Sequence, residues 1–329
     1  MKTFFISLNN FNEWIEALKS DFKIFLPYSK DAKYIISSPA LRYEFNSYRV
    51  SVPTLKNVLF TAREKVAPEY ETKKGKNIVF GLKSCDMASL PVLDFIFLNG
   101  AFVDPLYKEN RDNTVVVSSD CIDSLESCFC TLVGNNPYPE KYFDINLSPL
   151  DDGYLVNIAS EKGEKAISAK LLVQPSKDHL KEVELNRAKI KGHVSGQVVK
   201  QGFNVITNPQ KAVMDNFTSP VWEEAAKTCV ECGGCNLVCP TCHCFILSEH
   251  NFDKYRQYDA CQYKGFALVA GGGNPRKKLF QRLRNRYEKK FDFFQKNINL
   301  NGCTGCSRCI QACIGKIDMR EVMKKLVNK

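Results

Sequence analysis

Histidine is scarce in this sequence of 329 residues, which contains only four. Long apolar segments are missing too: the longest, Val92–Val103, is interrupted by Asp94 and Asn99 and is too short to cross a bilayer. The first ten residues hold too short an apolar run for a secretory signal. No GxGxxG follows an expected strand, so a flavin or nicotinamide fingerprint is missing. We therefore expect a soluble, cytoplasmic protein that does not insert into a membrane.

The composition is that of an ordinary globular protein, with 44% apolar and 25% charged residues. It excludes a mostly disordered or collagen-like chain. The length suggests two or three domains, each with room for a core. We expect an α/β domain over residues 1–150, a hairpin and helical linker over 151–215, and a second domain over 216–329.

Cysteine, in contrast, is abundant, with 15 residues. This is too many for chance filling of a core, and too few in a chain of this length for a disulfide scaffold. The odd number also disfavours complete pairing. In a reducing compartment, clustered cysteines usually bind metal or carry out redox chemistry.

One cysteine spacing occurs twice: CxxCxxCxxxC begins at Cys229 and again at Cys303. A cubane [4Fe–4S] cluster takes one thiolate per iron, and in paired-cluster ferredoxins the fourth cysteine of each run binds the other cluster. This rule predicts two clusters. Their ligand sets are Cys229, Cys232, Cys235 and Cys313 for the first, and Cys303, Cys306, Cys309 and Cys239 for the second. A zinc knuckle is the alternative, although two complete runs rarely serve zinc.

Glycines stand inside both runs. Gly233, Gly234 and Gly305 are the candidates for holding the clusters, since the backbone must bend around each cube and aim N–H groups at its sulfides. The 63 residues between Cys239 and Cys303 include a helix-like stretch, Pro275–Lys296. Such an insertion favours an all-α helical ferredoxin over the compact bacterial two-cluster fold.

Basic residues are dense in this helix-like stretch. They form either a solvated face that offsets cluster charge or a docking surface for a partner subunit. The docking candidates are Arg276, Lys277, Arg282 and Arg286.

The first 145 residues alternate between short apolar runs and helix-like segments, which predicts the α/β domain. Trp14, Ile15 and Leu18 share one face of a helix expected over Asn10–Lys19. Gly153–Ala159 and Lys165–Ser168 are expected to pair as a hairpin. The earlier strands are expected at Phe4–Leu8, Lys23–Leu26, Tyr34–Ser37, Val58–Thr61, Asn77–Leu82 and Thr114–Ser118.

Two further cysteines follow expected strands directly. Cys85 comes after Asn77–Leu82, and Cys121 comes after Thr114–Ser118. In an open parallel sheet both would lie at the carboxyl edge, where ligands gather. Cys128 and Cys130 lie within ten residues of Cys121, so we predict a third [4Fe–4S] site at these four thiols. Buried thiols or a zinc site are the alternatives.

Cys242, Cys244 and Cys261 remain unassigned. Three thiols fit packing or free thiols better than a further metal. His243, between two of them, either completes a metal site or places a proton near a cluster, although a lone histidine usually does neither. The three cysteines define an alternative function: a redox enzyme that uses them, next to a cluster, to react with thiols or sulfur compounds.

Residues 222–245, 258–291 and 303–318 resemble the iron–sulfur β subunits of cytoplasmic sulfhydrogenases and the related A subunit of anaerobic sulfite reductase. Cys85-Asp86 and Cys128-Phe129-Cys130 are similar to elements of the same family. The resemblance implies a non-catalytic electron-transfer subunit. Its partners would be a flavoprotein that oxidises NAD(P)H and a catalytic redox subunit, either a nickel–iron hydrogenase or a sirohaem sulfite reductase.

The sequence departs from this family at Ser84, His243, Ser307 and Ile314, where the family has Pro, an aromatic residue, Gly and Pro. These departures leave open which terminal enzyme the subunit serves.

Positive charge is concentrated near the C-terminus. The formal net charge is +10, and the last 79 residues hold 18 Lys and Arg against 6 Asp and Glu. An oxidised cluster with four thiolates contributes about −2. We therefore interpret the basicity as a counterweight to the clusters and expect no nucleic-acid partner. A nucleic-acid binder with structural metal remains the alternative, with an affinity that falls steeply with salt.

Overall fold

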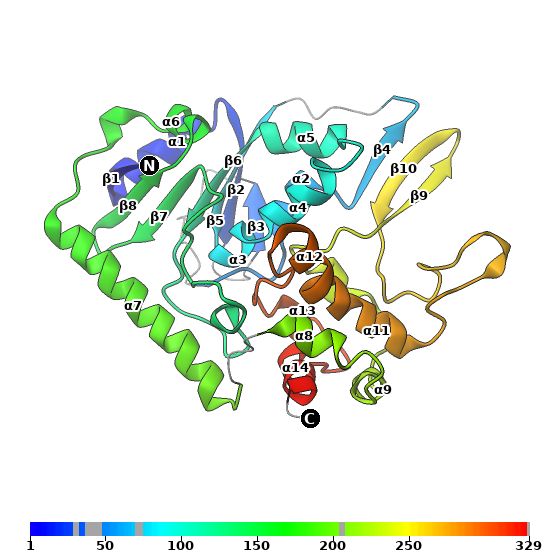
Figure 1. Ribbon diagram of the computed structural model, residues 1–329. Coiled ribbons are helices and arrows are strands. Elements are labelled where there is room, and N and C mark those ends of the chain that lie inside the picture. The colour runs from blue at the N-terminus through cyan, green and yellow to red at the C-terminus, as the bar shows by residue number, and fades with distance from the viewer. Residues whose placement is uncertain (29–32, 37–47, 70–74, 204–207, 328–329) are drawn as a thin grey trace.

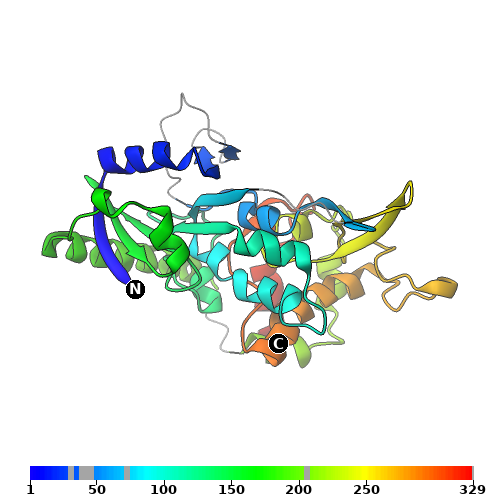
Figure 2. The same ribbon diagram turned by 90° about the horizontal axis from the view of Figure 1, so that it is seen from above.

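The computed structural model describes residues 1–28, 33–36, 48–69, 75–203 and 208–327 (Figure 1). Ser37, at the end of an expected strand, and residues 204–207 of the expected linker lie outside the described residues. A sheet formed by the N-terminal half lies beside a group of C-terminal helices (Figures 1 and 2). The long helix α7 (Lys177–Lys200) leads from one to the other. None of the described helices is long and apolar enough to span a membrane.

The N-terminal region contains a mixed sheet of seven strands in the order β1-β8-β7-β6-β5-β2-β3. The central strands β2, β5, β6 and β7 run parallel, and β3, β8 and β1 run antiparallel to their neighbours. The expected α/β architecture is therefore present, with antiparallel strands added at both edges. The strands are Lys2–Ser7 (β1), Phe22–Tyr28 (β2), Lys33–Ile36 (β3), Lys76–Leu82 (β5), Thr114–Ser119 (β6), Ile145–Pro149 (β7) and Gly153–Ile158 (β8).

Alternate side chains of the central strands build two apolar cores, because successive residues point to opposite faces. Phe80 packs with Trp14 on one face, and Val79 packs with Leu93 on the other. Burial on both faces explains why β5 and β6 are nearly continuous apolar runs. The helices of this region are α1 (Leu8–Leu18), α2 (Thr54–Leu59), α3 (Ser84–Met87), α4 (Leu90–Phe97), α5 (Pro105–Asp112) and α6 (Glu161–Ala166).

Two local expectations are wrong. Val58–Thr61 is not a strand, because Leu55 and Leu59 face the same core from helix α2. The expected hairpin after residue 150 is also absent. Gly153–Ile158 instead pairs with both β7 and β1, and helix α6 follows it. The Ser160 hydroxyl caps this helix by accepting from the Gly163 N–H (3.1 Å), which favours a helix over a second strand.

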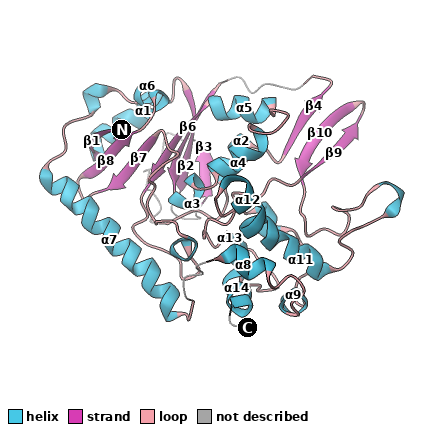
Figure 3. Cartoon of the chain, in the orientation of Figure 1, coloured by secondary structure: helices cyan, strands magenta, loops and turns pink. Residues whose placement is uncertain are grey.

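The C-terminal region combines short helices with a small sheet of the order β4-β10-β9 (Figure 3). The expectation of an all-α domain is therefore wrong. The hairpin of β9 (Phe245–His250) and β10 (Asp253–Tyr258) is extended by β4 (Arg63–Ala67) from the N-terminal half. Because an isolated hairpin is only marginally stable, the third strand from distant sequence supports it.

A second group of apolar side chains holds the C-terminal helices together. Trp222, Tyr287 and Met323 pack in one cluster and come from three different helices. The helices are α8 (Pro209–Met214), α9 (Val221–Ala226), α10 (Gly234–Leu237), α11 (Leu279–Glu288), α12 (Phe294–Ile298), α13 (Arg308–Gln311) and α14 (Met319–Val327). Helix α13 lies near α3, at the carboxyl ends of the parallel strands (Figure 3).

Candidate metal centres

The first expected ligand set lines a single cavity. Its members there are Cys229, Cys232, Cys235 and Cys313, joined by Cys309. The chain turns sharply at Gly233, whose φ is +69°, and a Cβ there would lie 2.6 Å from the Tyr263 hydroxyl oxygen. This position therefore favours glycine. A Cβ on Gly234 would make only ordinary contacts, the nearest at 3.5 Å from the Ala312 carbonyl oxygen.

The second expected ligand set also converges. Burial, together with nearby Cys309, Cys306 and Cys239, raises the pKa of the Cys303 thiol to about 12. The two cysteine loops are tied together next to this set, where the Thr241 hydroxyl donates to the Gly302 carbonyl (2.6 Å). The structure thus brings cysteines from both runs to one place, as the exchange of fourth ligands requires.

The four N-terminal cysteines line a different cavity. They are Cys85, Cys121, Cys128 and Cys130. Cys85 lies in α3 and Cys121 lies two residues after the end of β6, at the carboxyl ends of neighbouring parallel strands. Burial raises the pKa of Cys121 to about 12. Cys306 of the second ligand set lines the same cavity.

The three sets of cysteines form a continuous series in which the second set is central. Cys235 of the first set is an electrostatic neighbour of Cys309, and Cys85 of the third is a neighbour of Cys306. The backbone connects the second and third groups directly, because the Phe129 N–H donates to the Gly305 carbonyl (2.9 Å).

Buried cations surround the second ligand set. They are Lys56, Arg286, Lys290 and Arg308. Burial alone would lower the pKa of Lys290, but the adjacent Cys239 and Cys242 thiolates raise it above its ordinary value. Arg308 pairs with buried Asp86 (2.8 Å). Buried charges need compensating partners, and negative cluster ligands would supply them.

Arg286 Nε and Arg308 Nη2 are among the buried guanidinium nitrogens that have no hydrogen-bond partner within the described residues. Buried donors are normally satisfied. Both arginines lie beside cysteines of the second set, and the sulfur atoms of an iron–sulfur cluster accept such hydrogen bonds. The donors present therefore fit the predicted group. Among the residues that the structure describes, no group of three or more His, Cys, Asp or Glu side chains is arranged to hold a single metal ion.

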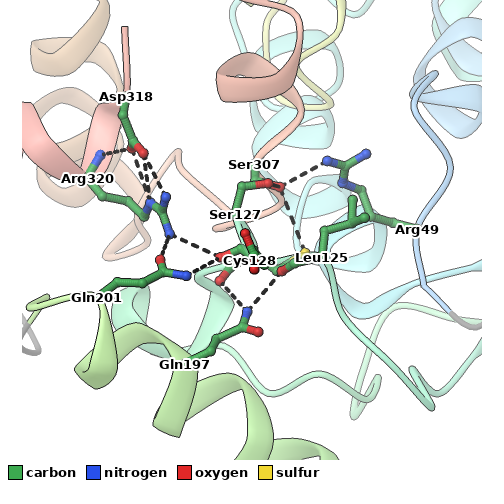
Figure 4. A network of polar contacts seen from close by, with 10 residues as sticks. Arg49, Leu125, Ser127, Cys128, Gln197, Gln201, Ser307, Asp318 and Arg320 are labelled. Atoms are coloured by element: carbon green, nitrogen blue, oxygen red, sulfur yellow. Dashed lines mark hydrogen bonds and ion pairs between the residues drawn. The ribbon is translucent and has the colours of Figure 1, made fainter. Parts of the chain in front are cut away.

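A polar network holds the loop that carries Cys128 against the second ligand loop (Figure 4). The Ser307 hydroxyl lies 3.0 Å from the Ser127 hydroxyl and 3.8 Å from the Cys128 sulfur, and it accepts from Arg49 Nη2 (2.9 Å). Gln197 of α7 donates to two carbonyls of the Cys128 loop (2.9 and 3.1 Å). Ser307 has a φ of +59°, so it keeps the left-handed backbone suited to glycine and adds a hydroxyl contact.

Two of the four docking candidates are wrong. Arg282 is 2% exposed and pairs with Glu231 (2.8 Å), while Arg286 is 4% exposed and donates to the Cys235 carbonyl (3.0 Å). The cysteine loops cover this face of α11, which helical periodicity alone does not reveal. Docking through Arg276 and Lys277 stays a prediction.

Several buried charged side chains beside the cysteines are not indicated by the sequence patterns. They are Arg49, Lys56, Lys83 and Arg308, all nearly fully buried. Arg308 lies inside the second cysteine run, so its position in the sequence could have indicated that it lies near a cluster. Lys83 donates to the Ser119 hydroxyl (2.7 Å) and the Asp120 carbonyl (2.9 Å), next to Cys121. Lys56 reaches the ligand loops from distant sequence, so nothing local identifies it.

The three unassigned cysteines and His243 line a separate cavity of about 390 Å³. Burial, and then the positive charge of Lys290, lower the pKa of His243 to about 4. The imidazole is therefore neutral near pH 7. The expected roles of this histidine as a metal ligand or proton carrier stay untested.

Replacing Gly305 by Ala is expected to destabilise the fold by at least about 2 kcal/mol and to reduce the iron content expected at the predicted third site. Gly305 has a φ of +69°, and a Cβ there would lie 2.4 Å from the Cys130 Cα. Thermal unfolding and iron analysis measure the effect. Gly192→Ala is the matched control, because its Cβ would enter open space in helix α7 and raise stability by about 0.5–1 kcal/mol. Equal stability of the two variants would contradict the prediction.

Comparison with known proteins gives two matches. Residues 228–317, which include both cysteine runs, match the family model of a 4Fe-4S dicluster domain. The chain is 33% identical over 258 residues to sulfhydrogenase 2 subunit beta of Pyrococcus furiosus, covering 77% of this chain and 74% of that protein. No solved structure matches significantly. The dicluster match implies two [4Fe–4S] clusters. The match to the sulfhydrogenase subunit confirms the family resemblance seen in the sequence.

Proposed function

Because the chain belongs to the family of sulfhydrogenase beta subunits, we propose that it relays electrons between two partner subunits, one of which holds the main catalytic site of the complex. Bound clusters would accept and release one electron at a time. The proposed partners are a flavoprotein that oxidises NAD(P)H and a catalytic redox subunit of the hydrogenase or sulfite-reductase type. Electrons enter and leave through these partners, because the sequence has no flavin or nicotinamide fingerprint.

The observation that supports this proposal is the continuous series formed by the three sets of cysteines. Cys235 and Cys309 are neighbours on one side of the second set, and Cys306 and Cys85 are neighbours on the other. An electron relay needs such close succession from one face of the subunit to the other. We assign the two ligand sets of the dicluster domain as the sequence predicts them.

We also propose a third [4Fe–4S] cluster at the N-terminal thiols. All four line one cavity, together with Cys306 of the second set. Arg308 lies between the two sets, where its pair with Asp86 is nearly inaccessible to water. This third site would extend the relay toward the α/β sheet.

The buried cations are proposed to set the order of potentials. Lys56, Arg286, Lys290 and Arg308 all lie near the second set and favour its more negative, reduced state. We therefore assign the highest reduction potential of the three to the central site.

A second candidate is the sulfur-handling enzyme. Cys242, Cys244 and Cys261 line a cavity large enough for a small ligand, which favours this function. Replacing each cysteine by Ser and assaying the whole complex separates the candidates. Unchanged turnover with intact clusters would exclude the enzyme.

The relay is tested on the full chain purified anaerobically. We expect about 12 iron atoms per chain, visible absorption bleached by dithionite, and electron paramagnetic resonance signals of reduced [4Fe–4S] clusters. About 8 iron atoms would restrict the proposal to the dicluster domain. Zinc in place of iron would reject it. Co-purification of the native complex identifies the two partners.

A further inference from the structure

Two cysteines outside all three ligand sets, Cys244 and Cys261, face the same cavity. The β9–β10 hairpin brings them there, because Cys244 precedes β9 and Cys261 lies just beyond β10, at the same end of the hairpin. The Asp259 N–H donates to the Cys244 carbonyl (3.0 Å), which continues the pairing of the two strands toward the cysteines. A disulfide between them forms when the two side chains approach each other in this cavity.

The pair connects to the first ligand set through one side chain. The Asn236 amide nitrogen donates to the Cys261 sulfur (3.0 Å), and its amide oxygen accepts from the Cys235 thiol (3.4 Å). Asn236 is itself 2% exposed, so its position is well defined by packing. A single buried amide thus bridges an expected cluster ligand and the pair.

The cavity beside the pair is strongly positive. Besides the cysteines, its lining includes Arg276, Arg286, Lys289 and Lys290 and no Asp or Glu among the described residues. Cys244 and Cys261 both line it, so a ligand in the cavity reaches the pair. An anionic ligand therefore fits the charge, and a disulfide fits the thiols.

We propose that Cys244 and Cys261 form a redox-active dithiol that exchanges with a small anionic disulfide bound in this cavity. The Cys261 thiolate attacks one sulfur of the ligand, which forms a mixed disulfide and releases one thiolate. Cys244, after losing its proton to solvent, then attacks the Cys261 sulfur. This closes the Cys244–Cys261 disulfide and releases the second ligand thiolate. The ligand gains two electrons, and the pair loses two.

The return step rests on the proposed function. Two electrons from the cluster relay, taken one at a time, and two protons from solvent restore the dithiol. The exchange itself needs no cluster, so the two proposals can fail separately.

The test uses the full chain, purified anaerobically with its iron content measured. Oxidised glutathione is the anionic probe, and cystamine is a cationic disulfide for comparison. After acid quenching and alkylation, mass spectrometry of the tryptic digest detects the cross-link. Lys254 and Arg256 lie between the two cysteines, so trypsin places them on different peptides. Because the Cys244 peptide, residues 228–254, carries five further cysteines, fragmentation of the linked peptide locates the cross-link.

We expect the Cys244–Cys261 cross-link in the wild type and in Cys242→Ser, and none in Cys261→Ser or Cys244→Ser. Oxidised glutathione should form it at least about tenfold faster than cystamine, and Lys289→Gln should reduce that preference. A sample with full iron content and no cross-link overturns this inference alone. Equal rates with both probes overturn the anionic ligand. A cross-link in an iron-free chain supports the exchange while rejecting the relay.

Discussion

Replacing Cys121 and Cys130 together by Ala is expected to lower the iron content from about 12 to about 8 atoms per chain. Both thiols line the cavity of the proposed third site, and neither belongs to the dicluster ligand sets. Iron analysis and electron paramagnetic resonance of the reduced protein measure the loss. In the native complex, electron flow should also fall to background, because one member of the series is missing.

Ser127→Ala is the matched control for this double variant. Ser127 stands in the same loop and contacts the Ser307 hydroxyl, but it is not a proposed ligand. We expect this variant to keep about 12 iron atoms. An iron content that stays the same in the double cysteine variant would show that the four thiols hold no cluster.

Replacing Lys290 by Met is expected to make the potential of the central cluster more negative by about 90 mV. Lys290 is 3% exposed, and Cys239 of the second ligand set is the group that most raises its pKa. A unit charge about 8 Å away, in an effective dielectric constant of about 20, contributes about 2 kcal/mol. For a one-electron couple this corresponds to about 90 mV. Redox titration followed by electron paramagnetic resonance measures the shift.

Lys296→Met provides the surface control for this charge. The Lys296 side chain is 58% exposed and pairs with Asp292, so water and salt screen its field. Its replacement should leave all potentials unchanged. A shift of the same size in both variants would indicate that net charge, rather than the buried ammonium group, sets the potential.

The β-strand cores and the ligand runs could be predicted from the sequence because their signals are local. Asn77–Leu82 and Thr114–Ser118 are short apolar runs, which the strands β5 and β6 match closely. The predicted exchange of fourth ligands followed from chemical valence, since three thiolates in one tight loop leave one iron without a ligand. The placement of Cys85 and Cys121 together followed from the geometry of parallel strands.

Other features depended on contacts between distant segments. The β9–β10 hairpin has only a short apolar run, Phe245–Leu247, in an otherwise largely polar sequence. Its third strand, β4, comes from nearly 200 residues earlier, so periodicity gave no sign of a sheet there. Arg282 and Arg286 look like surface residues on a helical projection, yet the cysteine loops bury them. Charge in a sequence shows which residues are ionised, but only packing shows how much water reaches them.

The sequence by itself therefore determined the dicluster domain and predicted its ligand sets, because spacing and valence act within a short stretch of chain. The tertiary structure decided the order of the three cysteine sets, the cations around the central one, and the cavity that Cys244 and Cys261 share. These properties depend on distances between segments separated by as many as 250 residues, such as Lys56 and Cys306 near the same ligand set. Electrostatic energies vary with distance and with exclusion of water, and neither is a property of sequence order.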